Sequence, residues 1–244
     1  SVAQFPEQNL YTPIAIIGSG FAGIGMAIRL QQERFNDFLI LEQATNFGGT
    51  WRDNTYPGAE CDVPSHLYSF SFEPNPHWSK SFAPQKEIQK YLLHCAQKHK
   101  LTEKILFNAE VVNASFNEAK GEWIVSLADD RIVRCRLLIM GNGGLSKPAY
   151  PNIEGQTQFQ GKTMHTARWD SSFDYAGKRV AVVGTGASAI QLIPELAKTA
   201  AQVVVFQRTP AWVMPKWDTH FSSHLQQEFA DHPNLRKALR YGIY

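Results

Sequence analysis

The chain has 244 residues, 43% of them hydrophobic and 19% charged, with a formal net charge of +2. The hydrophobic share is sufficient for one large core or two ordinary ones, and so low a charged share argues against an intrinsically disordered protein. The small net charge, with no dense run of Lys or Arg, argues against a nucleic-acid-binding protein.

Targeting segments and cysteines narrow the class further. No run of 18 apolar residues is present, so no membrane-spanning helix is predicted, and residues 1–10 lack the pattern of a signal peptide. The three cysteines, Cys61, Cys95 and Cys135, are odd in number and widely spaced. They predict neither a disulfide framework nor a metal site, and we expect a protein of the reducing cytoplasm.

The first part of the chain predicts a β-α-β unit. An apolar run at 13–17 predicts a buried strand that leads directly into glycines, 21–33 predicts a helix, and 38–41 predicts a second strand. Short connections of this kind are typical of a parallel α/β sheet.

The stretch 43–85 contains five prolines and many aromatic residues. A segment this long without regular structure is usually functional in a compact domain. An amphipathic helix is predicted at 85–100. Strands are predicted at 105–112, 122–128 and 131–140, as a small antiparallel excursion that returns to the sheet.

Glycines and prolines mark a boundary at 145–155. A second β-α-β unit begins at Lys178, with RVAVV as the strand, GTGASA as the turn, IQLIPELAKTA as the helix and QVVVFQ as the second strand. Pro194 within the helical stretch predicts a kink or a boundary. The predicted fold class is α/β, with two Rossmann-like domains: one at 1–150, and one at 151–244 that begins with a linker.

The first glycine motif is Gly18-Ser19-Gly20-x-x-Gly23. Gly18 allows a tight turn after the strand, Gly20 lets the backbone approach a pyrophosphate, and Gly23 lets helix and strand pack closely. The start of the following helix then offers free N–H groups and partial positive charge to phosphates. Glycines also serve ordinary turns, but the strand before this motif and the helix after it favour a dinucleotide site.

The second motif is Gly184-Thr185-Gly186-x-x-Ala189, in which alanine replaces the third glycine. Glu42 and Arg208 each lie 24 residues after the leading glycine of their motif, which predicts two copies of one scaffold. Glu42 can accept hydrogen bonds from ribose hydroxyls and would repel a 2′-phosphate, so the first site suits FAD or NAD. Arg208 can bind a 2′-phosphate, so the second site suits NADP, unless Arg208 is an ordinary solvated surface residue.

Residues 159–170 read FQGKTMHTARWD and match the pattern F-x-G-x-x-x-H-x-x-x-W-[P/D]. In this the chain resembles the Baeyer–Villiger monooxygenases, flavin enzymes that insert oxygen beside a ketone carbonyl. The resemblance extends over nearly the whole chain. It includes Gly48-Gly49-Thr50-Trp51, Tyr56-Pro57-Gly58-Ala59 with Cys61-Asp62, and Gln207-Arg208-Thr209-Pro210. Gly141-Asn142-Gly143 stands where the family has Ala-Thr-Gly, and Gly143 alone is kept.

The resemblance implies a role for particular residues. It implies FAD contacts from Gly18, Ser19, Gly20, Gly23, Glu42, Gly49, Thr50, Trp51, Asp62, Tyr68 and Gly143. It implies NADPH contacts from Gly184, Thr185, Gly186, Ser188, Ala189, Arg208 and Thr209. His165 would belong to the linker that couples domain motion to catalysis, with Trp169 as its anchor. The flavin disulfide reductases would need a second cysteine near Cys61, but position 66 is His66, so Cys61 is interpreted as structural.

The implied reaction uses NADPH, FAD and O₂, and converts a small-molecule ketone to an ester or lactone through a flavin C4a-peroxide. Asp62 would orient an arginine that stabilises the developing negative charge. In the family that arginine lies well downstream of the second glycine motif, and Arg236 and Arg240 match no catalytic motif. We therefore expect this chain to be the N-terminal part of a longer enzyme, truncated after the start of the NADP domain and incomplete for catalysis.

Two alternatives stay open. A flavin monooxygenase that oxidises nitrogen or sulfur has a similar fingerprint, but that fingerprint usually ends in Tyr or Phe rather than Trp169-Asp170. Its substrate would be an amine or a sulfide. The other alternative is a catalytically inert nucleotide-binding fragment of such an enzyme.

Overall fold

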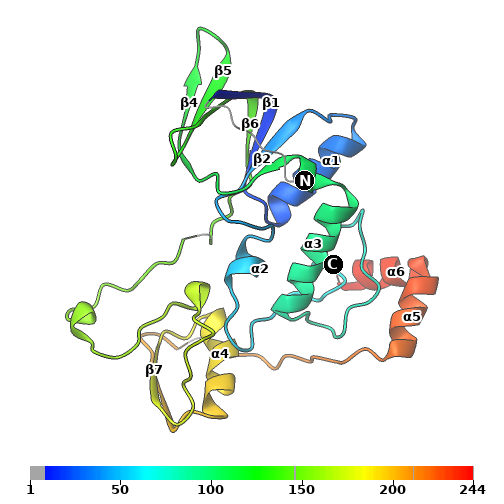
Figure 1. Cartoon of the computed structure of the whole chain (residues 1–244). Coiled ribbons are helices and arrows are strands. Elements are labelled where there is room, and N and C mark those ends of the chain that lie inside the picture. The colour runs from blue at the N-terminus through cyan, green and yellow to red at the C-terminus, as the bar shows by residue number, and fades with distance from the viewer. Residues whose placement is uncertain (1–8, 146, 211, 244) are drawn as a thin grey trace. The chain divides into compact units, whose positions relative to one another are not determined.

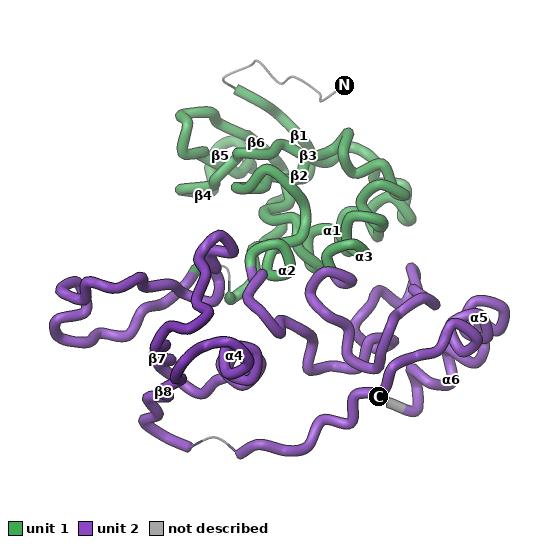
Figure 2. Tube along the Cα trace, turned by 60° about the horizontal axis from the view of Figure 1, so that its bottom comes forward, with its two compact units in different colours: residues 1–53, 89–147 green, residues 54–88, 148–244 purple. Residues whose placement is uncertain are grey.

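The computed structural model describes residues 9–145, 147–210 and 212–243 (Figure 1). The chain divides into two compact units. Unit 1 comprises residues 1–53 and 89–147, and unit 2 comprises residues 54–88 and 148–244 (Figure 2). The predicted domain limits, 1–150 and 151–244, stay predictions.

Unit 1 contains a sheet that has six strands among the described residues. Across the sheet the strands are β3 (Ile105–Leu106), β2 (Phe38–Leu41), β1 (Asn9–Ile17), β6 (Ile132–Met140), β5 (Glu122–Leu127) and β4 (Val111–Asn117). The first four are parallel to one another, and β5 is antiparallel to both β6 and β4. The predicted antiparallel excursion that returns to the sheet is thus confirmed.

The order of the parallel strands brings three loops together. The carboxyl ends of β2, β1 and β6 meet at one edge of the sheet because the three strands are parallel and adjacent. Glu42, Gly18 and Gly141 directly follow these three strands. Any ligand at this edge therefore meets residues from three separate stretches of the sequence.

The core of unit 1 is apolar. β2 is buried over its whole length, as expected for a strand in the interior of a parallel sheet. Ala15, Leu41, Val125 and Val133 belong to one buried cluster. Helix α1 (Phe21–Gln32) contacts β1 and β2 and buries Gly23, Ile24, Ala27 and Ile28, whose spacing follows one helical face.

Several predicted elements differ from the structure in their bounds. The strand predicted at 13–17 is β1, which begins earlier, at Asn9. The strand predicted at 105–112 is divided, because residues 107–110 leave the sheet and Asn108 has φ of 53°. The helix predicted at 85–100 is α3 (Gln85–Lys98); it ends before Lys100, whose φ of 53° is left-handed. A short helix, α2 (Thr50–Asp53), follows the glycine pair at 48 and 49.

Unit 2 contains the second β-α-β unit, which confirms the second Rossmann-like element. β7 (Arg179–Val183) and β8 (Gln202–Phe206) pair in parallel, and α4 (Ala187–Ala197) connects them. Pro194 lies inside α4 but does not end the helix, which continues to Ala197. The part of the chain that the structure describes adds no further strand to β7 and β8.

The remaining helices of unit 2 are α5 (Ser223–Asp231) and α6 (Pro233–Ile243). Ser222 caps α5, because its hydroxyl accepts a hydrogen bond from the Leu225 amide at 3.2 Å. Two residues contact the segment before α5. Ser81 N donates a hydrogen bond to Thr219 O, and Lys80 forms an ion pair with Asp218.

None of the helices in the described ranges is long and apolar enough to cross a membrane. The three cysteines are buried and form no disulfide in this structure, whose described ranges include all of them. Within those ranges no cluster of His, Cys, Asp or Glu could bind a metal ion.

Candidate nucleotide-binding sites

The first glycine turn links β1 to α1. Gly18 has φ of 93°, and its amide donates to Leu41 O at the end of β2, at 2.8 Å. Gly20 is the N-cap of α1, and no described side chain caps the helix there. The start of such a helix directs N–H groups and partial positive charge toward the turn, which is the arrangement that favours an anion.

Backbone crowding explains the glycines at this turn. A Cβ on Gly23 would lie 1.9 Å from Gly18 O, and a Cβ on Gly18 would lie 2.7 Å from Gly141 O. On the other side of the turn, a Cβ on Gly49 would lie 3.0 Å from the Cα of Gly20. Gly20 and Gly49 thus form a bare backbone cradle beside the start of α1, a feature that fits a pyrophosphate.

Glu42 lies at this cradle and is buried. Its Oε2 accepts hydrogen bonds from the Ser19 amide at 2.9 Å and the Ser19 hydroxyl at 2.6 Å, and its Oε1 accepts from the Ala44 amide at 2.9 Å. The fourth interaction is an ion pair with Arg52 at 3.0 Å. A carboxylate has about four acceptor positions. A ribose hydroxyl would therefore take the place of the Ser19 hydroxyl.

Arg52 and Gln89 belong to this site, although sequence reasoning did not select them. Arg52 pairs with both Glu42 and Asp53. Burial lowers the pKa of Arg52, but hydrogen bonds and charges from Asp53 and Glu42 outweigh burial and raise it. Gln89 Nε2 donates to Phe47 O at 2.8 Å and occupies the space beside Gly48. Both residues fix the loop that carries Gly49.

The other residues predicted around FAD divide between the units. Thr50 and Trp51 begin α2 in unit 1, and the Trp51 amide donates to Gly48 O at 3.2 Å. Gly143, with φ of 66°, follows β6 in the same unit. Asp62 and Tyr68 lie in unit 2.

The second glycine turn, in unit 2, repeats the backbone of the first. Gly184 has φ of 103°, and its amide donates to Phe206 O at the end of β8, at 2.9 Å. Gly186 is the N-cap of α4, again without a capping side chain among the described residues. Thr185 lies within the turn, and Ser188 and Ala189 lie in the first turn of the helix.

Arg208 lies one residue beyond the position in unit 2 that corresponds to Glu42 in unit 1. The last paired residues are Ile17 with Leu41 in unit 1 and Val183 with Phe206 in unit 2, which lie 24 and 23 residues apart. The structural counterpart of Glu42 is therefore Gln207, and the interpretation of the two offsets as one equal scaffold is wrong. The reason is the connection between the strands, because α1 has 12 residues and α4 has 11. Arg208 and Thr209 are exposed beyond the end of β8.

Asp62 belongs to a segment that is tied to α4. Gln191 Nε2 donates to Asp62 Oδ1 at 3.0 Å and to Glu60 O at 2.9 Å. Lys216 Nζ lies 3.8 Å from the same Asp62 oxygen and forms a shorter ion pair, 2.6 Å, with Glu60. The Asp62 side chain is 60% exposed, so its carboxylate is oriented by these contacts yet open to solvent.

Tyr56 lies between this segment and the second turn. Its hydroxyl donates to Gln191 Oε1 at 2.7 Å. Burial raises the pKa of Tyr56, an interaction with Ser188 opposes this, and the charges of Asp62 and Glu60 raise it further. The phenol is therefore a fixed neutral group.

The fingerprint segment is ordered by its own side chains. His165 Nδ1 accepts from the Ala167 amide at 3.0 Å, and its ring packs edge-on against Tyr150. Trp169 packs on Tyr175 and on the cluster that contains Tyr56. Hydrogen bonds from Lys162 and then Ser172 lower the pKa of Asp170 to about 2.

A cavity of about 580 Å³ lies in unit 2, beside Trp169. Tyr56, Phe173 and Tyr175 contribute aromatic walls, and Glu60, Lys80 and Glu195 contribute charges. Arg208 and the glycines of the second turn are not among its lining residues, so it is a separate hollow from the turn.

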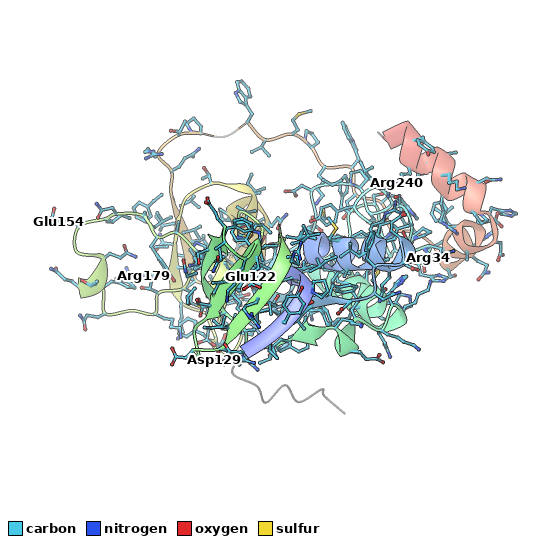
Figure 3. All side chains as sticks on the ribbon, turned by 90° about the horizontal axis from the view of Figure 1, so that it is seen from above. Arg34, Glu122, Asp129, Glu154, Arg179 and Arg240 are labelled. Atoms are coloured by element: carbon cyan, nitrogen blue, oxygen red, sulfur yellow. The ribbon has the colours of Figure 1, made fainter. Side chains whose placement is uncertain are left out.

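Cys61 and His66 have structural surroundings. Burial raises the pKa of the Cys61 thiol, which disfavours the reactive thiolate. His66 packs against Phe221 and Phe229, and burial, followed by the charge of Arg236, lowers its pKa to about 4. Arg240 on α6 donates to His66 O and Ser69 O, both at 3.0 Å (Figure 3). Arg240 therefore secures α6 to this segment.

A family model described as pyridine nucleotide-disulphide oxidoreductase matches residues 15–238. The chain belongs to this family. Two glycine turns in Rossmann-like units agree with the name of the family.

The curated relatives include Baeyer-Villiger monooxygenases. That of Pseudomonas aeruginosa is 47% identical over 239 residues, covering 98% of this chain and 45% of the relative. That of Streptomyces coelicolor is 42% identical over 245 residues, covering 99% of this chain and 47% of the relative. The FAD-binding monooxygenase tazF of Aspergillus terreus is 39% identical over 251 residues, covering 94% of this chain and 45% of the relative.

Solved structures of monooxygenases are also similar to this chain. Cyclohexanone monooxygenase from Rhodococcus sp. Phi1 bound to NADP+ has a TM-score of 0.86 at 32% identity, covering 94% of this chain and 44% of that one. Oxidized steroid monooxygenase bound to NADP has a TM-score of 0.84 at 35% identity, covering 92% and 44%. The predicted resemblance to the Baeyer–Villiger monooxygenases is confirmed. This chain spans about half the length of the curated relatives it matches.

Proposed function

We propose that this chain binds FAD at the first glycine turn and NADPH at the second, in a flavin monooxygenase that inserts one oxygen atom of O₂ beside a ketone carbonyl. One observation carries the proposal. Two uncapped helices, α1 and α4, follow parallel strands and left-handed glycines, one beside buried Glu42 and the other near exposed Arg208. The names of the relatives supply the class of reaction.

The residues of unit 1 fit FAD. The pyrophosphate would lie against the N–H groups at the start of α1, in the cradle of Gly20 and Gly49, where a side chain would fill the space. Glu42 would bind the ribose hydroxyls after the Ser19 hydroxyl turns away. Gly18 and Gly23 keep the turn compact, and Thr50, Trp51 and Gly143 would contact the rest of the cofactor.

The residues of unit 2 fit NADPH. Its pyrophosphate would lie against the start of α4, from Gly184 to Ala189, and Arg208 with Thr209 would bind the 2′-phosphate. When bound, NADPH supplies a hydride and FAD supplies the redox chemistry with O₂. Asp62 would hold an arginine in place through a charge-assisted hydrogen bond, and Tyr68 would lie near the flavin. His165 and Trp169 would order the linker.

Cofactor binding is tested by mixing the chain with FAD and removing unbound flavin by gel filtration. We expect a yellow protein whose flavin absorbance is bleached by NADPH without air, and much more slowly by NADH. Glu42→Lys should lose the colour, whereas the matched control Glu33→Lys, at the exposed end of α1, should keep it. Release of flavin by the unchanged chain would contradict the proposal.

The chemistry is tested by product analysis with a cyclic ketone and an aryl sulfide, for this chain and for the longest protein that contains it. A lactone from the ketone supports the Baeyer–Villiger reaction. Sulfoxide without lactone would instead favour a monooxygenase that oxidises sulfur or nitrogen. Flavin binding without any oxidation by the longer protein would favour a nucleotide-binding module.

A further inference from the structure

Gln191 was not selected by any motif, yet its side chain is one of the most fully used polar groups of unit 2. It lies near the start of α4, two turns before the end of the helix. Its Nε2 donates to Glu60 O at 2.9 Å and to Asp62 Oδ1 at 3.0 Å. Its Oε1 accepts from the Tyr56 hydroxyl at 2.7 Å and, more weakly, from the Glu60 amide at 3.4 Å.

These contacts fix the orientation of the amide. A side-chain amide has two N–H donors and one acceptor oxygen with two lone pairs, and all four positions are occupied here. If the amide were turned over, its oxygen would face two acceptors, Glu60 O and Asp62 Oδ1. The arrangement is therefore directional, and the donor side of Gln191 points toward the carboxylate of Asp62.

The backbone around Gln191 supports the contact. The loop that begins at Tyr56 lies so close to α4 that a Cβ on Gly58, whose φ is 79°, would lie 2.5 Å from Gln191 O. The Tyr56 ring packs on Leu192 and Leu196 of the same helix. The segment that carries Asp62 is thus attached to α4 by packing as well as by hydrogen bonds.

Gln191 lies on α4, three residues after Ser188, and the second glycine turn directly precedes this helix. Hydrogen bonds connect Tyr56, Gln191 and Asp62 in series. We propose that Gln191 is a positioning residue, which holds the Asp62 carboxylate in one orientation and links that orientation, through α4 and the Tyr56 hydroxyl, to occupancy of the second glycine turn.

The second carboxylate oxygen of Asp62, Oδ2, is open to a further interaction. Gln191 and Lys216 both approach Oδ1, and Oδ2 receives no hydrogen bond from the described residues. With Oδ1 fixed, Oδ2 presents one defined lone-pair direction to solvent. A cation placed there by another part of the enzyme would meet a carboxylate whose orientation depends on the nucleotide turn. This inference rests on the proposed function.

The test follows the aspartate carboxyl carbons by NMR in the 244-residue chain labelled with ¹³C-aspartate, with Asp62 assigned through Asp62→Asn. The ligand is adenosine 2′,5′-bisphosphate, which has the phosphates for the turn and for Arg208 but lacks the nicotinamide half that could touch Asp62 directly. Its Kd is measured in parallel by calorimetry.

We expect Gln191→Met, which keeps length and helix propensity, to move the Asp62 signal in the free protein by more than its linewidth. The ligand should shift the Asp62 signal of the unchanged chain. In Gln191→Met and in Tyr56→Phe that shift should fall to less than half, while Kd changes less than threefold. The matched control is Gln227→Met, because Gln227 Nε2 also donates to an aspartate, Asp231, at 2.9 Å. It should move the Asp231 signal and leave Asp62 unchanged.

Two results would overturn the inference: an Asp62 signal that does not respond to Gln191→Met, or a ligand-induced shift that survives intact in both variants. Absence of ligand binding by the unchanged chain would contradict the proposed NADPH site instead, and the spectra of the free protein would still decide whether Gln191 orients Asp62. If Gln191→Met failed to fold, by circular dichroism, Tyr56→Phe would carry the comparison, because it removes one hydroxyl.

Discussion

The two glycine turns have the same backbone in different surroundings. In unit 1, added Cβ atoms on Gly18 and Gly23 would meet backbone oxygens at 2.7 and 1.9 Å. In unit 2, a Cβ on Gly184 would have no described atom within 4 Å, and the third position is Ala189. In both turns the leading glycine has a left-handed φ that favours glycine. In unit 1 a side chain at this position would also clash with the backbone, whereas in unit 2 it would not. One sequence motif can thus arise from two constraints.

The units also differ in what stabilises them. Unit 1 has a buried apolar cluster between strands of one large sheet. Unit 2 has a small sheet, and its irregular segments are joined by charged and polar contacts, such as those of Glu60, Lys80, Lys216 and Asp218. Apolar packing tolerates changes of pH and salt better than charged contacts do. The two units should therefore respond differently to the same perturbation.

The largest expected effect is that of Gly23→Ala in the first turn. Because the new Cβ would lie 1.9 Å from Gly18 O, within a turn that β6 also borders, the backbone must shift. We expect a loss of more than about 3 kcal/mol in the free energy of unfolding, at the upper end for overpacking. Urea denaturation followed by far-UV circular dichroism measures it.

The second turn provides the matched substitution. Ala189→Gly restores the glycine in a place that has room for either residue, so its cost should be about 1 kcal/mol, from helix propensity. Equal losses of unfolding free energy for Gly23→Ala and Ala189→Gly would mean that backbone crowding is not the reason for glycine at position 23.

Acid should weaken unit 2 first, because His66 is buried against Phe221 and Phe229. Burial lowers its pKa from 6.5 to about 4 in the folded state. Between these values the unfolded chain binds more protons, so stability is complete above pH 6.5 and is lost as the pH falls toward 4. The loss from this one group should be about 2 kcal/mol at pH 5 and about 3 kcal/mol at pH 4.

Urea denaturation at several pH values measures this loss, with His66→Phe as the control that cannot titrate. The two proteins should differ in how steeply the free energy of unfolding changes with pH, and that difference is the contribution of His66. Limited proteolysis near pH 4.5 should cut α5 and α6 before α1. Parallel pH profiles for the two proteins would show that His66 does not distinguish the units.

Much of this fold could be predicted from the sequence, because strands and helices depend on local patterns. Apolar runs ended by glycines predicted both β-α-β units, and β2 was predicted to the residue. The break at 107–110 was missed because the left-handed Asn108 carries no periodic signal. The position of Arg208 was misjudged because a motif counts residues along the chain, whereas the site depends on which residues pair between strands.

The missed site residues have a common cause. Gln191 contacts Glu60, which is 131 residues away in the sequence, so no local pattern could select it. Arg52 is a single charge beside a recognised loop, and its pairing with Glu42 needs the strand order to be known. Polar contacts between distant segments follow from the fold and cannot be read before it.

Arg208→Gln tests the assignment of the second turn to NADP. Removing a charge-assisted contact to the 2′-phosphate should weaken NADP⁺ binding roughly 10- to 100-fold and leave NAD⁺ binding unchanged. Calorimetry with both nucleotides measures the ratio. The control is Arg179→Gln, which removes an arginine at the opposite end of β7 (Figure 3). Equal weakening for both nucleotides would remove the 2′-phosphate role from Arg208.

The smallest expected effect concerns Lys80, which bridges Glu60 and Asp218 at 2.6 Å each. Burial lowers the pKa of Lys80, but the hydrogen bonds of Asp218 and Glu60 outweigh burial and raise it, so the amine stays charged. Lys80→Met should reduce the free energy of unfolding by about 1 kcal/mol at low salt, and by less in high salt because exposed ion pairs are screened. Lys86→Met, at an exposed position of α3, is the control. If both variants had the same free energy of unfolding, the charged contacts would not stabilise unit 2. The two units would then differ only in the size of their sheets.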